Sequence, residues 1–256
     1  PFQKEQRIED AVQVLKGPQL GSLKYRIGLL TGRFGAEHPL KACVTCMEDD
    51  QASLGVAYWH LTHQYPGVIL CPIHGTLLSV SEVNRQRTGV FEWTLPCKNQ
   101  LHPCTLKTPT AASNKALSNL EISIVDLLKH RSEHFNPEIT RQVYKAALNT
   151  LGWPGDGQVA AIESFAAFAS LLQPFPPFTS LPTTPAGVRA FLHSMTRKPR
   201  GCFHPLKHLV LINWIYNGFS QFVEEYNFLD SVHSQIDETQ LIERTTQLSP
   251  EKHQSN

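Results

Sequence analysis

The stretch Cys43-Val44-Thr45-Cys46, followed 24 residues later by Cys71-Pro72-Ile73-His74-Gly75, decides how the N-terminal half of this chain folds. Two thiols separated by two residues lie on one tight turn and point toward a common centre. The second pair adds a thiol and an imidazole, which completes a tetrahedral set. Zn²⁺ prefers such a set, and four protein ligands without an open position are typical of a structural site. The predicted ligands of one structural zinc ion are Cys43, Cys46, Cys71 and His74.

Ordinary core cysteines are the alternative interpretation of these four residues. Two independent pairs at a suitable separation disfavour it.

The composition of the 256 residues is that of a globular protein, with 41% hydrophobic and 18% charged residues. A chain of this length holds one large domain or two small ones. Its formal net charge of +1 does not by itself indicate a nucleic-acid partner.

Six cysteines without a visible secretory segment indicate a reducing compartment, so we expect a cytoplasmic protein. The apolar runs are short, which predicts no membrane span. Changes in residue pattern divide the chain into four predicted parts. These are residues 1–42, the helical end of a truncated upstream region; 43–106, a zinc-finger module; 107–229, a helical DNA-binding domain; and 230–256, a flexible tail. The predicted fold class is mostly α with a small zinc-bound β-hairpin module (α+β) and a helix-turn-helix-like helical C-terminal half.

Several local patterns predict particular elements. Thr76–Val80 and Val90–Leu95 flank a polar stretch, which predicts a β-hairpin after the second zinc pair. Asn136-Pro137-Glu138 predicts a helix start, with a cap, a proline at the first position and an acid at the positive end of the dipole. Ser118-x-x-Glu121 predicts a capping box. An amphipathic pattern predicts one long helix from Pro205 to about Phe228.

The distribution of charge is more informative than its sum. No acidic residue occurs between Glu163 and Glu224, and four of the five cations of this stretch lie within positions 197–207. A cluster of cations without nearby acids favours binding to the phosphate backbone of nucleic acid, because each contact between a cation and a phosphate releases condensed counterions. A solvated loop with a chance charge bias is the alternative. The predicted contacts to double-stranded DNA are Arg189, Arg197, Lys198, Arg200, His204 and Lys207, with Arg85 and Arg87 in the zinc module.

A pair of predicted helices at 137–151 and 158–172 has the order of a helix-turn-helix, although the connection Gly152–Gly157 is longer than usual. The second helix has few side chains suited to reading bases. Plain core packing is therefore an equal alternative for this pair.

Two further groups of residues contain side chains of the kind that bind metals. Cys97, His102 and Cys104 are candidate ligands of a second zinc ion, with a fourth ligand from His60, His63, Cys202 or His204. Their spacing is not that of a familiar knuckle, so loop thiols and a surface histidine are the favoured interpretation. His60 and His63 have the spacing of a hydrolase site, but no glutamate lies between them and the first zinc set is already complete. We expect them to pack around the knuckles or to contact phosphate, and we expect no enzyme.

The run from Ala57 to Leu78, AYWHLTHQYPGVILCPIHGTLL, together with the preceding Cys43–Cys46, resembles the TniQ/TnsD family of transposon target-site selectors. The run His204–Ile212, HPLKHLVLI, resembles its TnsD branch. The likeness covers most of residues 30–225. It implies a sequence-specific DNA-binding protein of the bacterial nucleoid that marks an insertion site. Such a protein recruits an AAA+ ATPase regulator of the TnsC type, which brings the transposase. The zinc ligands of the family fall on Cys43, Cys46, Cys71 and His74.

The resemblance also leaves an alternative function. The family usually carries an additional N-terminal segment, often tied to recruiting the ATPase, ahead of the point where this sequence starts. Some TniQ members dock on CRISPR effector complexes and carry a second Cys-rich ribbon, for which only Cys97, His102 and Cys104 are available here. An adaptor that docks on such a complex for RNA-guided transposition is therefore the alternative to a DNA-reading selector.

Overall fold

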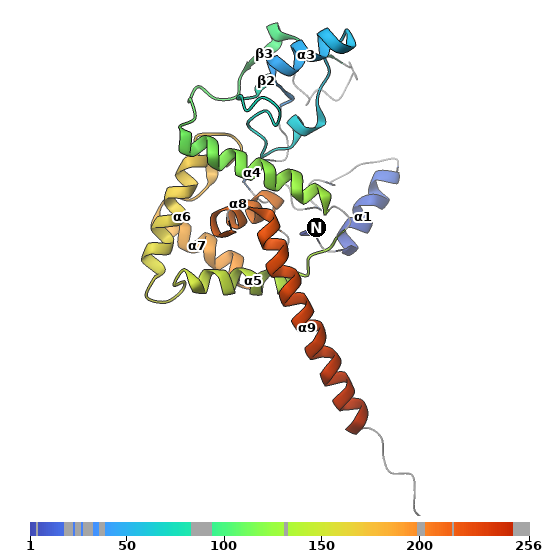
Figure 1. Cartoon of the computed structure of the whole chain (residues 1–256), viewed down its shortest axis with the longest axis vertical. Helices are drawn as coiled ribbons and strands as arrows, with labels where there is room; N and C mark the ends of the chain where they lie inside the picture. Colours follow the sequence, from blue (N-terminus) through green and yellow to red (C-terminus); the bar gives the residue numbers. More distant parts are fainter. Residues whose placement is uncertain are drawn as a thin grey trace, which may run out of the picture.

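The structure, a computed structural model, describes residues 1–3, 5–17, 23, 27, 33–35, 39–82, 94–130, 133–198, 203–216 and 218–247, with side chains up to residue 235. It is mostly helical with a small antiparallel sheet of three strands, which confirms the predicted mostly α class with a small β element (Figure 1). The helix-turn-helix-like character of the C-terminal half stays a prediction. The helices are α1 (Glu5–Lys16), α3 (Val44–Leu54), α4 (Ala111–Lys129), α5 (Pro137–Thr150), α6 (Gln158–Leu172), α7 (Pro185–Thr196), α8 (Pro205–Tyr216) and α9 (Phe219–Gln247). The strands are β1 (Lys41–Ala42), β2 (Ser79–Ser81) and β3 (Leu101–Pro103).

The three strands form a sheet in the order β1-β2-β3, with Val80 of β2 opposite Lys41 on one side and His102 on the other. The sequence predicted a different partner for Thr76–Val80, namely Val90–Leu95, of which residues 90–93 lie outside the described part. The loop that carries Cys71 and His74 is itself a tight hairpin, closed by a bridge between Leu70 and Leu77. The turn leads into β2, which pairs with β1.

Helices α4 to α9 pack into one group. Helix α4 contacts α6, α8 and α9, while α5 contacts α7 and α9, and α6 contacts α7. Figure 1 shows α8 in the middle of this group. The sequence of α8 suits this place, because Leu209, Val210, Leu211 and Ile212 are consecutive apolar residues and all four are buried. Among the described residues, no helix has both the length and the apolarity to cross a bilayer.

The Cys/His-rich module and the helices share one hydrophobic core. Val68, Ile69 and Leu70, which lie between the two cysteine pairs, belong to the same buried cluster as residues of α4 and α8. Gly67 makes this close approach possible, since a Cβ there would lie 2.6 Å from Ile124 Cδ1 and 2.7 Å from Leu206 Cδ2. The four-part division of the chain stays a prediction, and the buried cluster extends across its boundary at 106.

The N-terminal residues also pack into the helical group. The ring of Phe2 is buried and stacks on His208 of α8, with a centroid distance of 4.1 Å. The carbonyl of Pro1 accepts a hydrogen bond from Phe135 N at 3.1 Å. This end of the chain is therefore part of the core of the helices.

The helix ends test the local predictions. Asn136 accepts a hydrogen bond from Glu138 N at 2.9 Å, with Pro137 at the first helical position, which confirms the predicted start of α5. The capping box at Ser118 and Glu121 is wrong, because α4 begins at Ala111 and is capped by Thr110 through Ser113 N. Ser118 and Glu121 therefore lie inside α4, next to the buried Leu117 and Leu120.

The last predicted helix differs most from the structure. The pattern from Pro205 to Phe228 is two helices, α8 and α9, with Gly218 between them. Glycine is a poor helix former, and periodicity alone does not reveal a change of direction. Helix α9 also continues to Gln247, past the predicted start of the tail at residue 230. In Figure 1 its last turns extend beyond the other helices, where no amphipathic face is needed.

Candidate metal centre and basic surface

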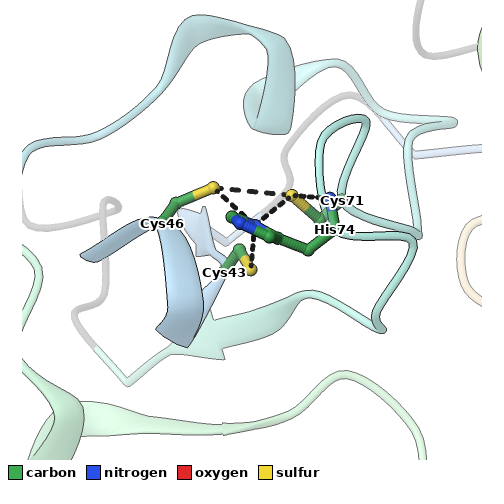
Figure 2. A group of neighbouring side chains, drawn as sticks. All are labelled: Cys43, Cys46, Cys71 and His74. Carbon is green, nitrogen blue, oxygen red and sulfur yellow. Dashed lines mark hydrogen bonds between the residues drawn. The ribbon is translucent and has the colours of Figure 1, made fainter. Parts of the chain in front are cut away.

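Two short segments place the four predicted ligands. Cys43 is the residue before α3 and Cys46 lies in the first turn of that helix. Cys71 and His74 lie on the hairpin loop, where Cys71 N donates to Thr76 O at 2.7 Å and Gly75 N donates to Cys71 O at 2.8 Å. Gly75 has a φ of +64°, the left-handed conformation that glycine adopts without strain. Figure 2 shows the four side chains converging from these two segments.

Four of the six distances between the candidate ligand atoms are close to those around a tetrahedral ion, and all four atoms lie within 4.8 Å of one another. The Sγ atoms of Cys46 and Cys71 are 3.5 Å apart. His74 Nδ1 lies 3.3 Å from Cys46 Sγ, 3.5 Å from Cys43 Sγ and 3.6 Å from Cys71 Sγ. A Zn²⁺ ion with ordinary bond lengths to three sulfurs and one nitrogen requires edges of about 3.5–3.8 Å. The cluster is therefore compatible with a zinc site.

The chemistry of the donor atoms also fits a cation. All three cysteines are buried, and burial raises the pKa of the Cys46 and Cys71 thiols. Burial acts in the same direction on Cys43, but hydrogen bonds, foremost with Thr76, outweigh it and lower the pKa of this thiol to about 6. Metal ligation takes the deprotonated form of each sulfur, and a cation among the three would offset the cost of burying thiolates so close together.

A carboxylate contacts the candidate histidine ligand on its outer side. His74 Nε2 lies 3.2 Å from Asp49 Oδ2, on the side of the ring opposite to the sulfurs. Such a partner fixes the orientation of a ligating imidazole. Asp49 and Asp50 follow Cys46 by one helical turn in α3, and this spacing is the sequence signal that would have revealed them.

His60 and His63 pack beside the cluster, as one of the predicted alternatives stated. Their rings are stacked with centroids 4.9 Å apart, and His60 Nε2 lies 2.9 Å from Asp50 Oδ2. His63 Nε2 lies 3.5 Å from Cys71 Sγ. Both histidines come within 4.8 Å of Cys46 as a second possible ligand group. However, Cys46 already belongs to the first set, and His63 is 1% exposed, which excludes contact with a phosphate backbone in this conformation.

The residues predicted for a second zinc ion do not come together. Among the described residues, the groups of metal-ligating side chains do not include Cys97, His102 and Cys104. Cys97 is exposed and Cys104 is partly buried, while His102 Nδ1 lies 3.8 Å from Glu82 Oε1. Cys202 lies outside the described residues. These findings agree with the favoured interpretation as loop thiols and a surface histidine.

The predicted DNA contacts have different surroundings. Arg189, Arg197 and Lys198 are exposed. Lys207 is partly buried, donates to Ser194 Oγ at 2.7 Å and lies 4.0 Å from the centroid of the Phe203 ring. Burial lowers the pKa of Lys207 to about 8, and Arg197 adds to this effect. Arg85, Arg87 and Arg200 lie outside the described residues.

His204 is not on the surface where the sequence analysis placed it. Its side chain is 3% exposed, and its Nδ1 accepts a hydrogen bond from Leu206 N at 3.2 Å. This bond satisfies a free N–H in the first turn of α8. The ring therefore supports the start of α8 instead of presenting a charge to DNA.

Two basic residues that sequence reasoning missed hold the structure together. Lys41 is 5% exposed, and its Nζ donates to Tyr65 O at 2.7 Å and to Val68 O at 2.6 Å. Arg141 of α5 donates from Nη1 to Thr196 O, at the end of α7, over 3.3 Å. Neither role has a sequence signal, because both depend on contacts between distant segments.

The fold and the site define a class of protein: a helical protein whose Cys₃His knuckle module shares the core of its helices. The model of the family described as TnsD, Tn7-like transposition protein D, matches residues 120–236, from α4 into α9. This match confirms the predicted resemblance and supports the assignment of the chain to a TniQ/TnsD-type family. It falls on the helices, whereas the zinc ligands lie before it, so the two indications are independent. No curated protein matches the chain.

Proposed function

We propose that this chain is a DNA-binding target-site selector of a Tn7-like transposon. The observation that carries the proposal is the exposed basic surface of Arg189, Arg197 and Lys198, on α7 and just after it. It lies within the residues that match the TnsD family and in a stretch of the chain without a single acid. A surface with this charge suits the phosphate backbone of duplex DNA.

In this proposal Cys43, Cys46, Cys71 and His74 hold one Zn²⁺ ion. The ion stabilises a segment with little secondary structure of its own, and a complete protein ligand set leaves no position for a reacting water. The protein therefore selects a site without catalysing a reaction. The DNA-bound protein marks the insertion site in the bacterial nucleoid, and an AAA+ ATPase regulator of the TnsC type then brings the transposase.

The test is duplex binding as a function of salt. The DNA comes from the flank of the native insertion site, a scrambled duplex is the comparison, and footprinting maps the contact. We expect a preference for the native flank and a steep loss of affinity with salt. The double variant Arg197→Glu, Lys198→Glu is expected to lose at least about tenfold in affinity and to reduce the salt slope by about two contacts.

Lys16→Glu is the matched control, because Lys16 is an exposed cation on α1, away from α7 in Figure 1. Its effect on affinity should be small. Equal losses in both variants would contradict the assignment of the DNA-binding surface. A protein that binds no duplex, but co-purifies with an RNA-guided effector complex, would instead support the adaptor function.

A further inference from the structure

We infer that α7 is the helix that enters the major groove of DNA, and that Arg189 is a residue that reads bases from it. This inference rests on the proposed DNA-binding function and names the element and side chain through which sequence is read. It starts from the exposed face of α7, which includes Ala186, Arg189, Ala190 and His193, with Arg197 directly after the end of the helix. The four positions within α7 follow one another at helical spacing, so they form a single stripe along one side of the helix.

The other side of α7 is fixed in the core. Val188, Phe191, Leu192 and Met195 are buried, and α7 packs on both α5 and α6. Arg141 of α5 holds the C-terminal end of α7 through the carbonyl of Thr196. The exposed stripe is therefore presented by a helix with a fixed orientation, as a reading element requires.

The exposed side of α6 is a poorer candidate. Its exposed residues include Val159, which is 59% exposed, together with Glu163 and Ser164, and it carries no cation. A carboxylate and an apolar side chain there would face the negative charge of DNA. Residues 158–172 are the second helix of the helix-turn-helix that the sequence offers, whereas the charge on the surface favours α7.

The chemistry of the stripe fits base edges. The major groove is about 12 Å wide and admits an α-helix, so a side chain on the exposed face of α7 can reach base edges there. Arginine recognises guanine through two hydrogen bonds, and alanine allows close approach and contacts the thymine methyl group. Arg189 lies between Ala186 and Ala190, so its guanidinium extends from a face that can come close to the bases. Arg197 lies at the end of the helix beside Lys198, where contacts to phosphate are expected.

The test compares base preference with affinity. Selection from a randomised DNA library defines the preferred site of the wild-type protein, and a set of single base-pair changes then measures discrimination. Arg189→Ala is expected to lose about 10- to 100-fold in discrimination at one or two base pairs. Arg197→Ala is expected to weaken binding to all sequences alike and to reduce the salt slope by about one.

Two further variants make the outcome decisive. Arg189→Lys keeps the charge but not the paired hydrogen bonds, so it should lose discrimination while keeping the salt slope. Glu163→Gln on α6 is the control and should leave base preference unchanged. Thermal unfolding verifies that each variant is folded. If Arg189→Ala and Arg189→Lys keep the wild-type preference, the inference is wrong and the stripe contacts phosphate or an acidic protein. If the wild-type protein has no affinity for duplex DNA, the proposed function fails as well.

Discussion

Asp49 Oδ2 lies 3.2 Å from His74 Nε2, the ring nitrogen that points away from the three cysteine sulfurs. This contact joins the first cysteine pair to the second, because Asp49 lies on α3 and His74 on the hairpin loop. It is the geometry of a carboxylate that orients a metal-bound imidazole.

Replacing this carboxylate should weaken zinc binding without abolishing it. We expect Asp49→Asn to reduce zinc affinity about 10- to 100-fold, because the imidazole loses its orienting partner. A competition titration with a coloured chelator measures the change. The control is Glu48→Gln, since Glu48 is a neighbouring exposed acid whose Oε1 lies 2.5 Å from Lys98 Nζ. An equal effect in both variants would mean that net charge, and not the His74 contact, is responsible.

Removing a ligand should remove the metal. Purified protein is expected to contain about one zinc ion per chain, and Cys71→Ser is expected to lose it, because three remaining donors do not close the tetrahedron. Metal analysis and thermal unfolding with and without chelator measure both effects. Cys97→Ser is the matched control, since Cys97 is exposed. Loss of metal in this control would support a second zinc site that includes Cys97.

Gly67 should not tolerate a side chain. A Cβ at this position would meet Ile124 and Leu206 at less than 3 Å, in the middle of the shared core. We expect Gly67→Ala to lower the free energy of unfolding by about 1–3 kcal/mol, because two packed side chains must move. Urea unfolding measures it. Gly155→Ala is the control, as its Cβ would lie 3.6 Å from the carbonyl of Gly152, an ordinary contact. A neutral Gly67→Ala would contradict the close packing of module and helices.

Glu121 should make stability depend on pH. Its side chain lies inside α4, 7% exposed, and burial raises the pKa of this carboxyl from 4.5 to about 7. The folded state therefore holds the proton more tightly than the unfolded chain does. This contribution to stability is complete below about pH 4.5 and is lost as the pH rises through 7.

We expect the stability of Glu121→Gln to rise relative to the wild-type protein over this pH range, because glutamine carries no charge that burial disfavours. Urea unfolding of both proteins at several pH values gives the difference. The corresponding difference for Glu163→Gln, at an exposed position of α6, should stay constant. A constant difference for Glu121→Gln as well would contradict the role of its burial.

Some features of the protein were predictable because they depend on residues close in sequence. The pairs Cys43/Cys46 and Cys71/His74 each lie on one turn, and the fold brings the two pairs together into one cluster that is compatible with a zinc site. The start of α5 depends on the cap residue Asn136, which accepts a hydrogen bond from the backbone of Glu138, only two residues further along the chain. The resemblance to the TniQ/TnsD family also came from continuous runs, and the family match over residues 120–236 supports it.

Other features depend on segments that the fold brings together. The sequence alone does not distinguish the buried Lys41, which donates to two carbonyls, from the exposed Lys198. His204 lay in a basic run but is buried at the start of α8, and β2 pairs with strands that local pattern did not identify as partners. A polar side chain loses its contact with water only when segments from elsewhere in the chain cover it, and local sequence does not reveal which segments do so. The sequence by itself therefore determined the candidate metal ligands, the mostly helical class and the resemblance to the TniQ/TnsD family. Only the tertiary structure decided which cations and which helix face are exposed to solvent, because distant segments of the chain decide what is covered.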